Sequence, residues 1–244
     1  MTATGLDQLT AQQLLEHAIS TWGDRFALVT SFQTEGMVLL DMAARISPNV
    51  RVITLDTGRL PAESFDLMDQ VVRRYGVRIE TVLPDAAEVE SMVSRFGPNL
   101  FRESVAHRRA CCEVRKVRPL ARKLVTVDAY AVGLRRGQSE GREEVAKAAE
   151  VNGKWKLSPL ADWSKDQVLT YIHDHDVPLH PLYARGYTSI GCAPCTRATT
   201  PGEHERAGRW WWEQGGNSEC GLHFSADGRV ERSVDVLLRE ILSN

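Results

Sequence analysis

The chain has 244 residues, of which 43% are hydrophobic and 25% are charged. This apolar content suits one large domain or two small ones and excludes a disordered protein. The net charge of −2 excludes a generally basic nucleic-acid binder, and no apolar run approaches the length of a transmembrane helix. Residues 1–13 lack the basic-then-apolar pattern of a signal peptide. We therefore expect a cytoplasmic protein with no nucleic-acid or membrane partner.

Strands and helices are predicted to alternate through the first 134 residues. Buried-strand patterns occur at residues 26–31, 50–55, 77–83 and 128–134. Helical patterns occur at residues 10–21, 36–46, 61–75, 85–96 and 103–124, and again at 164–175. Pro119 lies inside the fifth of these helices and is expected to kink or break it. The alternation predicts βαβ units, and hence an α/β fold with a parallel, twisted sheet flanked by helices.

Polar loops follow the predicted strands at the edge of the sheet where ligands bind in such folds. Residues 31–36 precede a helix, whose free N–H groups favour an anion, but they match neither the P-loop nor the dinucleotide fingerprint. Residues 56–59, Asp-Thr-Gly-Arg, offer side chains that can bond a ribose or a base. Either loop alone is equally well explained as an ordinary turn. Together, at neighbouring strand ends, they favour a nucleotide site.

The five cysteines fall into two tight pairs and one isolated residue. Cys111 and Cys112 are adjacent, Cys192 and Cys195 form a C-x-x-C pair, and Cys220 stands apart. Clustered thiols in a reducing compartment indicate metal ligands or catalysts rather than disulfides. Four thiolates from two segments suit a 4Fe–4S cluster, with zinc as the alternative, although zinc usually takes two spaced pairs.

Positive charge is concentrated around the first cysteine pair. Residues 102–123 hold eight Arg or Lys against two Glu, in a chain whose net charge is −2. A charge run is usually a solvated helix face, but here it would offset the negative charge of four thiolates. Near the C-terminus, Arg206, Arg209 and His223 flank Cys220 among glycines. A lone cysteine is more commonly an incidental thiol, but neighbouring cations would favour its thiolate and the flanking glycines imply a mobile segment.

Three cysteine motifs in this order resemble one known family. They are Ala-Cys-Cys-Glu-Val-Arg-Lys-Val-Arg-Pro-Leu at 110–120, Gly-Cys-Ala-Pro-Cys at 191–195 and Glu-Cys-Gly-Leu-His at 219–223. Together they resemble the thioredoxin-dependent assimilatory adenylyl-sulfate (APS) reductases, a branch of the APS/PAPS reductase family, over about residues 20–230. The resemblance implies a fold similar to the adenine-nucleotide hydrolases. It also implies one 4Fe–4S cluster per chain, on Cys111, Cys112, Cys192 and Cys195.

The resemblance also implies a reaction and its residues. Adenylyl sulfate would be reduced to sulfite and AMP with electrons from thioredoxin or a similar dithiol, as a step of sulfate assimilation towards cysteine. Cys220 would be the nucleophile that forms an S-sulfocysteine, with Lys116 and His223 as further catalytic residues. The substrate-binding positions carried over are Ser31, Thr57, Gly133, Arg142, Arg206 and Arg209. We expect a nucleotide-binding domain over residues 1–200 and a catalytic C-terminal segment over 201–244; a homo-oligomer is left open.

Several alternatives stay open at this point. The loop at residues 31–36 lacks the Ser-Gly pair common in the wider family, which leaves its contacts undecided. The four paired cysteines favour APS because PAPS reductases of the family lack them, yet some cluster-bearing members accept both substrates. A non-enzymatic redox or metal sensor is a third hypothesis. An ATP-dependent sulfurtransferase is a fourth, disfavoured because the chain lacks a Ser-Gly-Gly pyrophosphate loop.

Overall fold

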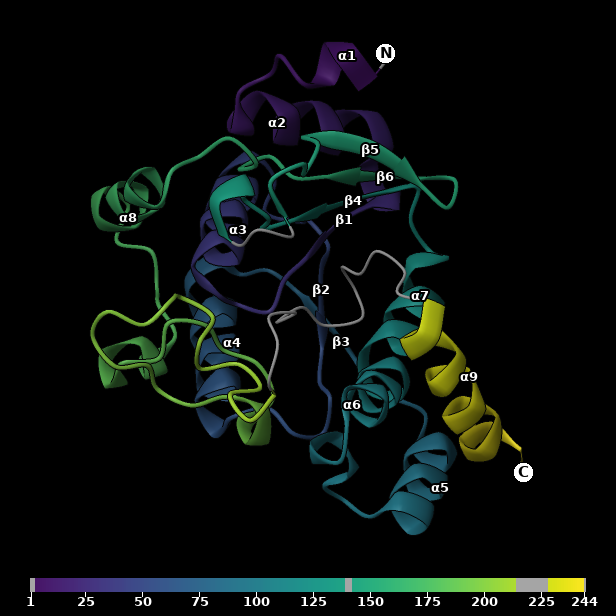
Figure 1. The fold of residues 1–244 in the computed structure, drawn as a ribbon. Helices are drawn as coiled ribbons and strands as arrows, with labels where there is room; N and C mark the ends of the chain where they lie inside the picture. The colour runs from purple at the N-terminus through teal and green to yellow at the C-terminus, as the bar shows by residue number, and fades with distance from the viewer. Residues whose placement is uncertain (1–2, 139–141, 214–227, 244) are drawn as a thin grey trace.

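The computed structural model describes residues 3–138, 142–213 and 228–243 (Figure 1). Within these residues, six strands form one sheet in the order β3-β2-β1-β4-β6-β5, and only the edge strand β5 is antiparallel to its neighbour. The strands are β1 Phe26–Val29, β2 Val52–Leu55, β3 Ile79–Val82, β4 Ala129–Val132, β5 Ala148–Val151 and β6 Lys154–Leu157.

Helices cover both faces of this sheet. They are α1 Ala3–Leu6, α2 Ala11–Trp22, α3 Thr34–Ile46, α4 Ala62–Tyr75, α5 Ala86–Phe96, α6 Val105–Cys112, α7 Arg118–Leu124, α8 Lys165–Asp174 and α9 Gly228–Leu242. A π-helical segment, Glu113–Val117, joins α6 to α7. Short 3-10 helices lie at Gly23–Arg25, Leu100–Arg102, Arg136–Gln138, Pro181–Arg185 and Ala193–Cys195. In the described part of the chain, no helix is long and apolar enough to span a membrane.

Alternating side chains of the central strands build two apolar layers. Phe26 and Leu28 of β1 join the larger core, which α2, α3 and α4 complete. Ala27 points the other way and packs with Leu120 of α7. This alternation is the period of two expected of a strand covered on both faces.

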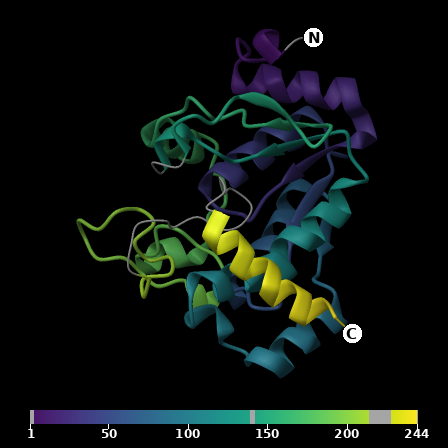
Figure 2. The same cartoon turned by 45° about the vertical axis from the view of Figure 1, so that its right-hand side comes forward.

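A third layer lies beside the sheet and carries the first cysteine pair. There α9 packs on α5 and α6 (Figure 2). The apolar cluster between these helices includes Cys111, Cys192, Cys195 and Trp210. Segments 80 residues apart in the sequence therefore meet in one core.

The predicted fold class is confirmed, and each predicted strand and helix is present with slightly different ends. The helices α1 and α9, the β5–β6 hairpin, the π-helical segment and the short 3-10 helices were not predicted. The sheet is therefore mixed, not purely parallel. The hairpin turns at Asn152-Gly153, both with positive φ (52° and 70°), and Asn-Gly is the sequence signal for such a turn.

The interruption expected near Pro119 is present, but it takes the form of a π-helical segment just before the proline and not of a chain break. The helical path runs on from α6 to α7 because the wider π turn lets the Arg118 N–H bond the Glu113 carbonyl. Pro119 then occupies the first turn of α7. A missing N–H costs little there, since the first turn of a helix leaves its N–H groups unpaired.

One buried carboxylate ties three helices together. Asp41 of α3 is fully buried and accepts hydrogen bonds from Arg45 Nε (2.8 Å) and from the hydroxyls of Tyr75 (3.0 Å) and Tyr171 (2.8 Å). The two tyrosines belong to α4 and α8. Burial alone would raise the pKa of Asp41, but these hydrogen bonds outweigh it and hold the pKa below its usual value.

We expect Asp41→Asn to lower the free energy of unfolding at pH 7 by about 2 to 3 kcal/mol, because it removes a buried charged acceptor of three donors. The folded-state pKa is depressed, so this stabilisation is present above the unfolded value of about 3.9 and is lost as pH falls through the folded value. Urea unfolding at pH 7 and at a pH below the folded-state pKa measures it. Tyr75→Phe, which removes one donor, should cost less; an equal Asp41→Asn effect at both pH values would contradict the account.

Candidate functional site

A cavity of about 370 Å³ opens between the sheet and α7. The ends of β1, β2 and β4 form one wall, and Leu120, Ala121 and Leu124 of α7 form the other. Ser31 and Gly133, two of the predicted substrate-binding residues, line it. Its place at the carboxyl ends of parallel strands and its size both suit a nucleotide.

Two glycines let the cavity's backbone segments touch. A Cβ on Gly36 would lie 2.3 Å from Thr30 Oγ1, and one on Gly133 would lie 2.7 Å from the Gly36 nitrogen. Phe32, in the loop that leads to Gly36, is buried with a φ of 56°. Its N–H donates to Thr30 Oγ1 at 3.0 Å. A buried aromatic residue in the left-handed region is strained backbone of the kind that gathers at functional sites.

A buried ion pair braces the same loops. Arg135 Nε donates to Glu35 Oε1 at 2.8 Å, and Thr34 Oγ1 donates to Glu35 Oε2 at 2.8 Å. Burial would raise the pKa of Glu35, but the Arg135 and Thr34 contacts outweigh it and lower the pKa. The sequence analysis named neither Glu35 nor Arg135 as a site residue, because only the fold joins positions 100 residues apart.

The four paired cysteines line one small pocket, called the thiol pocket below. They are all buried and none is in a disulfide. Burial and the neighbouring thiols raise the pKa of Cys111 to about 12 and that of Cys195 to about 11. Burial would raise the pKa of Cys192 too, but Lys116, a hydrogen bond with Thr57, and two arginines outweigh it and lower the pKa. The pocket therefore combines crowded thiols with nearby cations.

The loop after β2 holds the C-x-x-C turn. Thr57 Oγ1 lies 3.2 Å from Cys192 Sγ, and the Ala193 N–H donates to the Arg59 carbonyl at 2.8 Å. Arg115 of the π segment donates through Nη1 to the Thr57 carbonyl at 2.7 Å. Thr57, expected to bind substrate, is thus buried with the cysteines and does not line the cavity.

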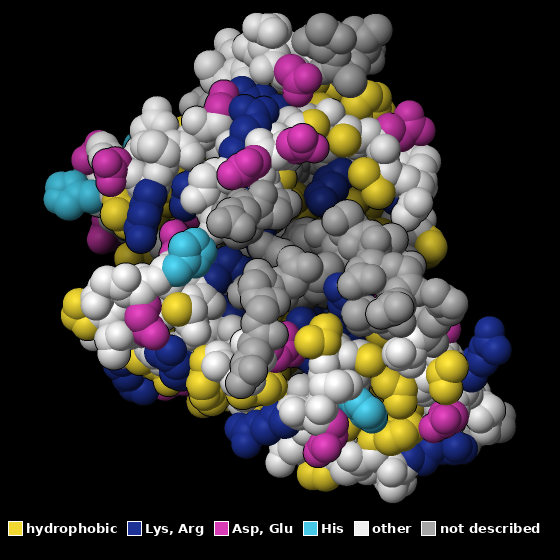
Figure 3. Space-filling model, viewed as in Figure 1, with side chains coloured by type: hydrophobic (Ala, Val, Ile, Leu, Met, Phe, Trp, Pro, Cys, Tyr) yellow, Lys and Arg dark blue, Asp and Glu magenta, His cyan; other side chains and the backbone are white. Residues whose placement is uncertain are grey.

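Several cations lie at the thiol pocket. Figure 3 shows Lys and Arg side chains in dark blue near the middle of the face seen in Figure 1. Lys116 lines it together with Arg59, Arg108 and Arg115. Arg209 is buried, and its guanidinium carbon lies 4.6 Å from the centre of the Trp210 ring. A Cβ on Gly191 would lie 2.2 Å from Arg209 Nη2, so glycine leaves room for this guanidinium beside Cys192.

The π segment links the thiol pocket to the cavity. Lys116 lines the pocket, whereas the next residue, Val117, lines the cavity. A π turn inside a helix is frequent at functional sites. Beyond the cavity, Arg142 and Gln33 also line a smaller polar pocket that contains Arg206.

The predicted site residues therefore fall into three groups. Ser31, Gly133 and Arg142 line the cavity, Arg206 lies in the polar pocket beside it, and Lys116, Thr57 and Arg209 lie with the four cysteines. Cys220 and His223 lie outside the described residues.

The thiol pocket contains donors that lack acceptors. Arg115 Nε, Arg209 Nε and Trp210 Nε1 are buried and make no hydrogen bond to any described residue. Buried N–H groups normally find a partner, and thiolate or sulfide sulfur would accept from them. No set of three or more His, Cys, Asp or Glu within the described ranges is arranged to hold a single metal ion. The unpaired N–H groups beside the four thiols would suit a thiolate-bound, negatively charged group.

The chain is also similar to known proteins over most of its length. Residues 25–198 match the family model described as the phosphoadenosine phosphosulfate reductase domain. The chain belongs to this family. It is 48% identical over 202 residues to adenosine 5'-phosphosulfate reductase of Allochromatium vinosum (82% of this chain, 79% of that one) and 44% identical over 222 residues to that of Burkholderia cepacia (90% and 86%).

Solved structures agree with the family. The phosphoadenylyl-sulfate (PAPS) reductase of Candida auris, crystallised as a phosphate complex, superposes with a TM-score of 0.67 at 27% identity, over 79% of this chain and 92% of that one. Yeast FAD synthetase (TM-score 0.56, 14% identity, 80% and 67% covered) shares the fold alone. The family resemblance, the reductase assignment and the fold predicted from the sequence are confirmed.

We expect Gly133→Ala to weaken nucleotide binding at least about 10-fold and to lower stability by about 1 to 3 kcal/mol, because the new methyl group meets the backbone of α3 and not a movable side chain. Isothermal titration with AMP and urea unfolding measure the two effects. Gly137→Ala is the matched control, since the contact that its Cβ would make with the described residues is Arg135 Nη1 at an ordinary 3.7 Å. Equal behaviour of the two variants would contradict the close-contact argument.

Proposed function

We propose that the chain reduces adenylyl sulfate to sulfite and AMP, the activity implied by the name of its curated relatives. One observation carries the proposal: the consecutive residues Lys116 and Val117 line a pocket of four thiols and a nucleotide-sized cavity, respectively. The nucleotide would occupy the cavity, with its sulfate directed towards the thiol pocket. Thioredoxin or a similar dithiol would be the reductant.

Electrostatics supports this assignment. A thiolate that attacks a sulfate ester meets like-charge repulsion, which fixed cations reduce most effectively in a desolvated site. Lys116 and Arg209 both lower the pKa of Cys192, which places their charge at the thiol pocket. Arg142 and Arg206 line the adjoining polar pocket and would bind the phosphate side of the substrate.

The reaction proposed at Cys220 has two steps. Its thiolate attacks the sulfate sulfur, an S–S bond forms, and the bridging S–O bond breaks so that AMP leaves with the electron pair. A reductant thiolate then attacks Cys220 Sγ and releases sulfite, and the second reductant thiol displaces Cys220 as a thiolate. The reductant ends as a disulfide and supplies the two electrons. His223 would assist at the sulfate, as the family resemblance implies.

The four paired cysteines would hold a 4Fe–4S cluster. When bound, the cluster would supply a fixed negative charge, which the unpaired N–H groups of Arg115, Arg209 and Trp210 are suited to meet as donors. The end of α6 supplies Cys111 and Cys112, the Ala193–Cys195 turn and the residue before it supply Cys195 and Cys192, and Lys116 lines the same pocket.

Anaerobic protein incubated with APS, without reductant, should gain the mass of one SO₃ group. Cys220→Ser should gain none, because it lacks the attacking thiol. Intact-mass spectrometry measures both, with full iron content as the sign that the variant is folded. An adduct that persists in Cys220→Ser would contradict the proposal.

The same experiment with PAPS separates the substrate alternatives. Labelling by PAPS at a rate equal to that by APS would indicate dual specificity. Labelling by neither nucleotide, in protein that contains its metal, would favour a sensor over an enzyme.

Cys111→Ser and Cys192→Ser should each lose most of the bound iron and acid-labile sulfide, since each removes one of four proposed ligands. Metal and sulfide analysis of anaerobically purified protein measures the loss. Cys220→Ser is the control and should retain both. Zinc without sulfide in the wild type would contradict the cluster and support the zinc alternative.

A further inference from the structure

The nucleotide cavity contains a lysine that no motif in the sequence indicated. Lys156 lies on β6 and lines the cavity between the sheet and α7. Its neighbours along the strand, Trp155 and Leu157, pack into the core on the opposite face. The alternation of the strand therefore directs Lys156 to the α7 side, next to its register partner Tyr130 on β4.

The surroundings of Lys156 are apolar. Tyr130 and Leu124 line the same cavity, and Tyr130 is 9% exposed. Among the residues that the structure describes, no hydrogen bond or ion pair reaches the Lys156 ammonium. A half-buried ammonium in such a place costs free energy unless an acceptor or an anion meets it.

The second charged group of the cavity is also a cation. Among the described lining residues, Arg142 and Lys156 are the charged side chains, and none is Asp or Glu. Burial lowers the pKa of Lys156, and the nearby Arg142 charge lowers it further. Arg142 itself is held by a hydrogen bond to Gln138. The described cavity wall is thus a site of net positive charge, which an anionic ligand would neutralise.

We propose that Lys156, together with Arg142, binds a phosphoryl group of the nucleotide inside the cavity. This inference rests on the proposed function, which supplies the nucleotide. It assigns Lys156 a different place from the cations at the thiol pocket: Lys116 and Arg209 act where the sulfur reacts, whereas Lys156 acts where the nucleotide is held. The phosphate is either the 5'-phosphate that AMP and APS share or a 3'-phosphate as in PAPS.

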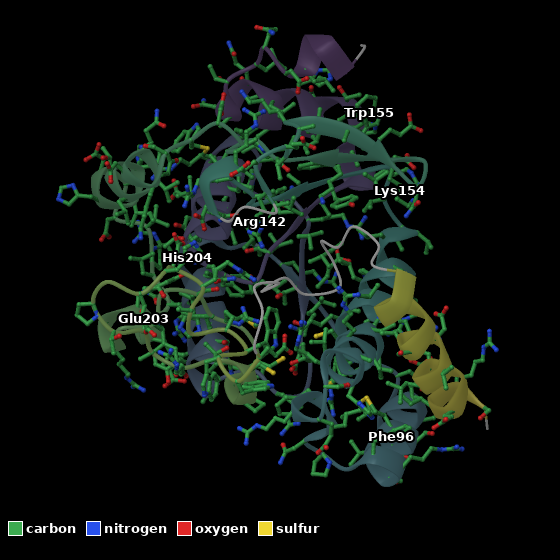
Figure 4. All side chains as sticks on the ribbon, viewed as in Figure 1. Phe96, Arg142, Lys154, Trp155, Glu203 and His204 are labelled. Carbon is green, nitrogen blue, oxygen red and sulfur yellow. The ribbon has the colours of Figure 1, made fainter. Side chains whose placement is uncertain are left out.

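Lys154 offers a matched control on the same strand. It lies two residues before Lys156, but its ammonium donates to the Val127 carbonyl at 2.7 Å and does not line the cavity. Figure 4 shows Lys154 at the end of the hairpin, apart from Arg142 near the middle of the molecule. Replacing either lysine by methionine keeps the aliphatic stem and removes one positive charge.

The test is calorimetric binding of three probes to anaerobically purified protein: adenosine, AMP and adenosine 3',5'-bisphosphate. Lys156→Met should weaken AMP binding about 10- to 100-fold, the value of a charge-assisted hydrogen bond, and leave adenosine binding unchanged. Lys156→Arg should restore most of the affinity. Lys154→Met should bind all three probes like the wild type. Thermal unfolding checks that each variant is folded.

The three probes also separate the outcomes. A loss seen with AMP identifies the 5'-phosphate as the ligand of Lys156, and a loss confined to the bisphosphate identifies the 3'-phosphate. Unchanged binding of all probes by Lys156→Met, or an equal loss for adenosine, would overturn the inference. If the wild type binds none of the probes, the proposed function itself fails.

Discussion

The site depends on the burial of four sulfur atoms close to one another. All four thiols line one pocket, and burial, with a smaller contribution from the neighbouring thiols, raises the pKa of Cys111 and of Cys195. Cys192, faced by Lys116 and Arg209 and bonded by Thr57, instead has its pKa lowered. The fold buries cations beside the sulfur atoms. Solvent screens them least there, so they stabilise negative charge on sulfur most effectively.

The same constraint explains why distant segments are tied so closely to one another. The β2 loop bonds the C-x-x-C turn through Arg59 and Thr57, and Arg115 bonds that loop from the other side. Arg108, fully buried beside the cysteines, is paired with Glu213. An uncompensated buried charge is far more costly than a paired one. The arginines that face the thiols are therefore held in place: Arg59 and Arg115 by backbone carbonyls, Arg108 by a carboxylate, and Arg209 against the Trp210 ring.

The sequence predicted those parts of the site whose residues are close together in the chain. The cysteine pairs, Lys116 and the strand-end loops are short motifs, and the structure brings them to adjoining pockets. The pairs Glu35–Arg135 and Asp41–Tyr171 join positions 100 and 130 residues apart, so no local pattern shows them. Lys156 could not be predicted as a site residue, because an isolated lysine in a hairpin is ordinarily exposed to solvent. The hairpin itself does have a local signal, because Asn152-Gly153 is a typical turn pair.

The π segment joins α6 to α7 and also changes the direction in which the side chains of α7 face relative to those of α6. A residue in a regular helix turns by about 100° relative to the one before it. The extra residue in the Glu113–Val117 π turn therefore rotates the side chains of α7 by about 100° around the helix axis relative to Cys111 and Cys112. The cysteines can thus face the thiol pocket while α7 faces the sheet, although both lie on one helical rod. The relative orientation of the thiol pocket and the nucleotide cavity is thereby encoded in the residue count of a single turn.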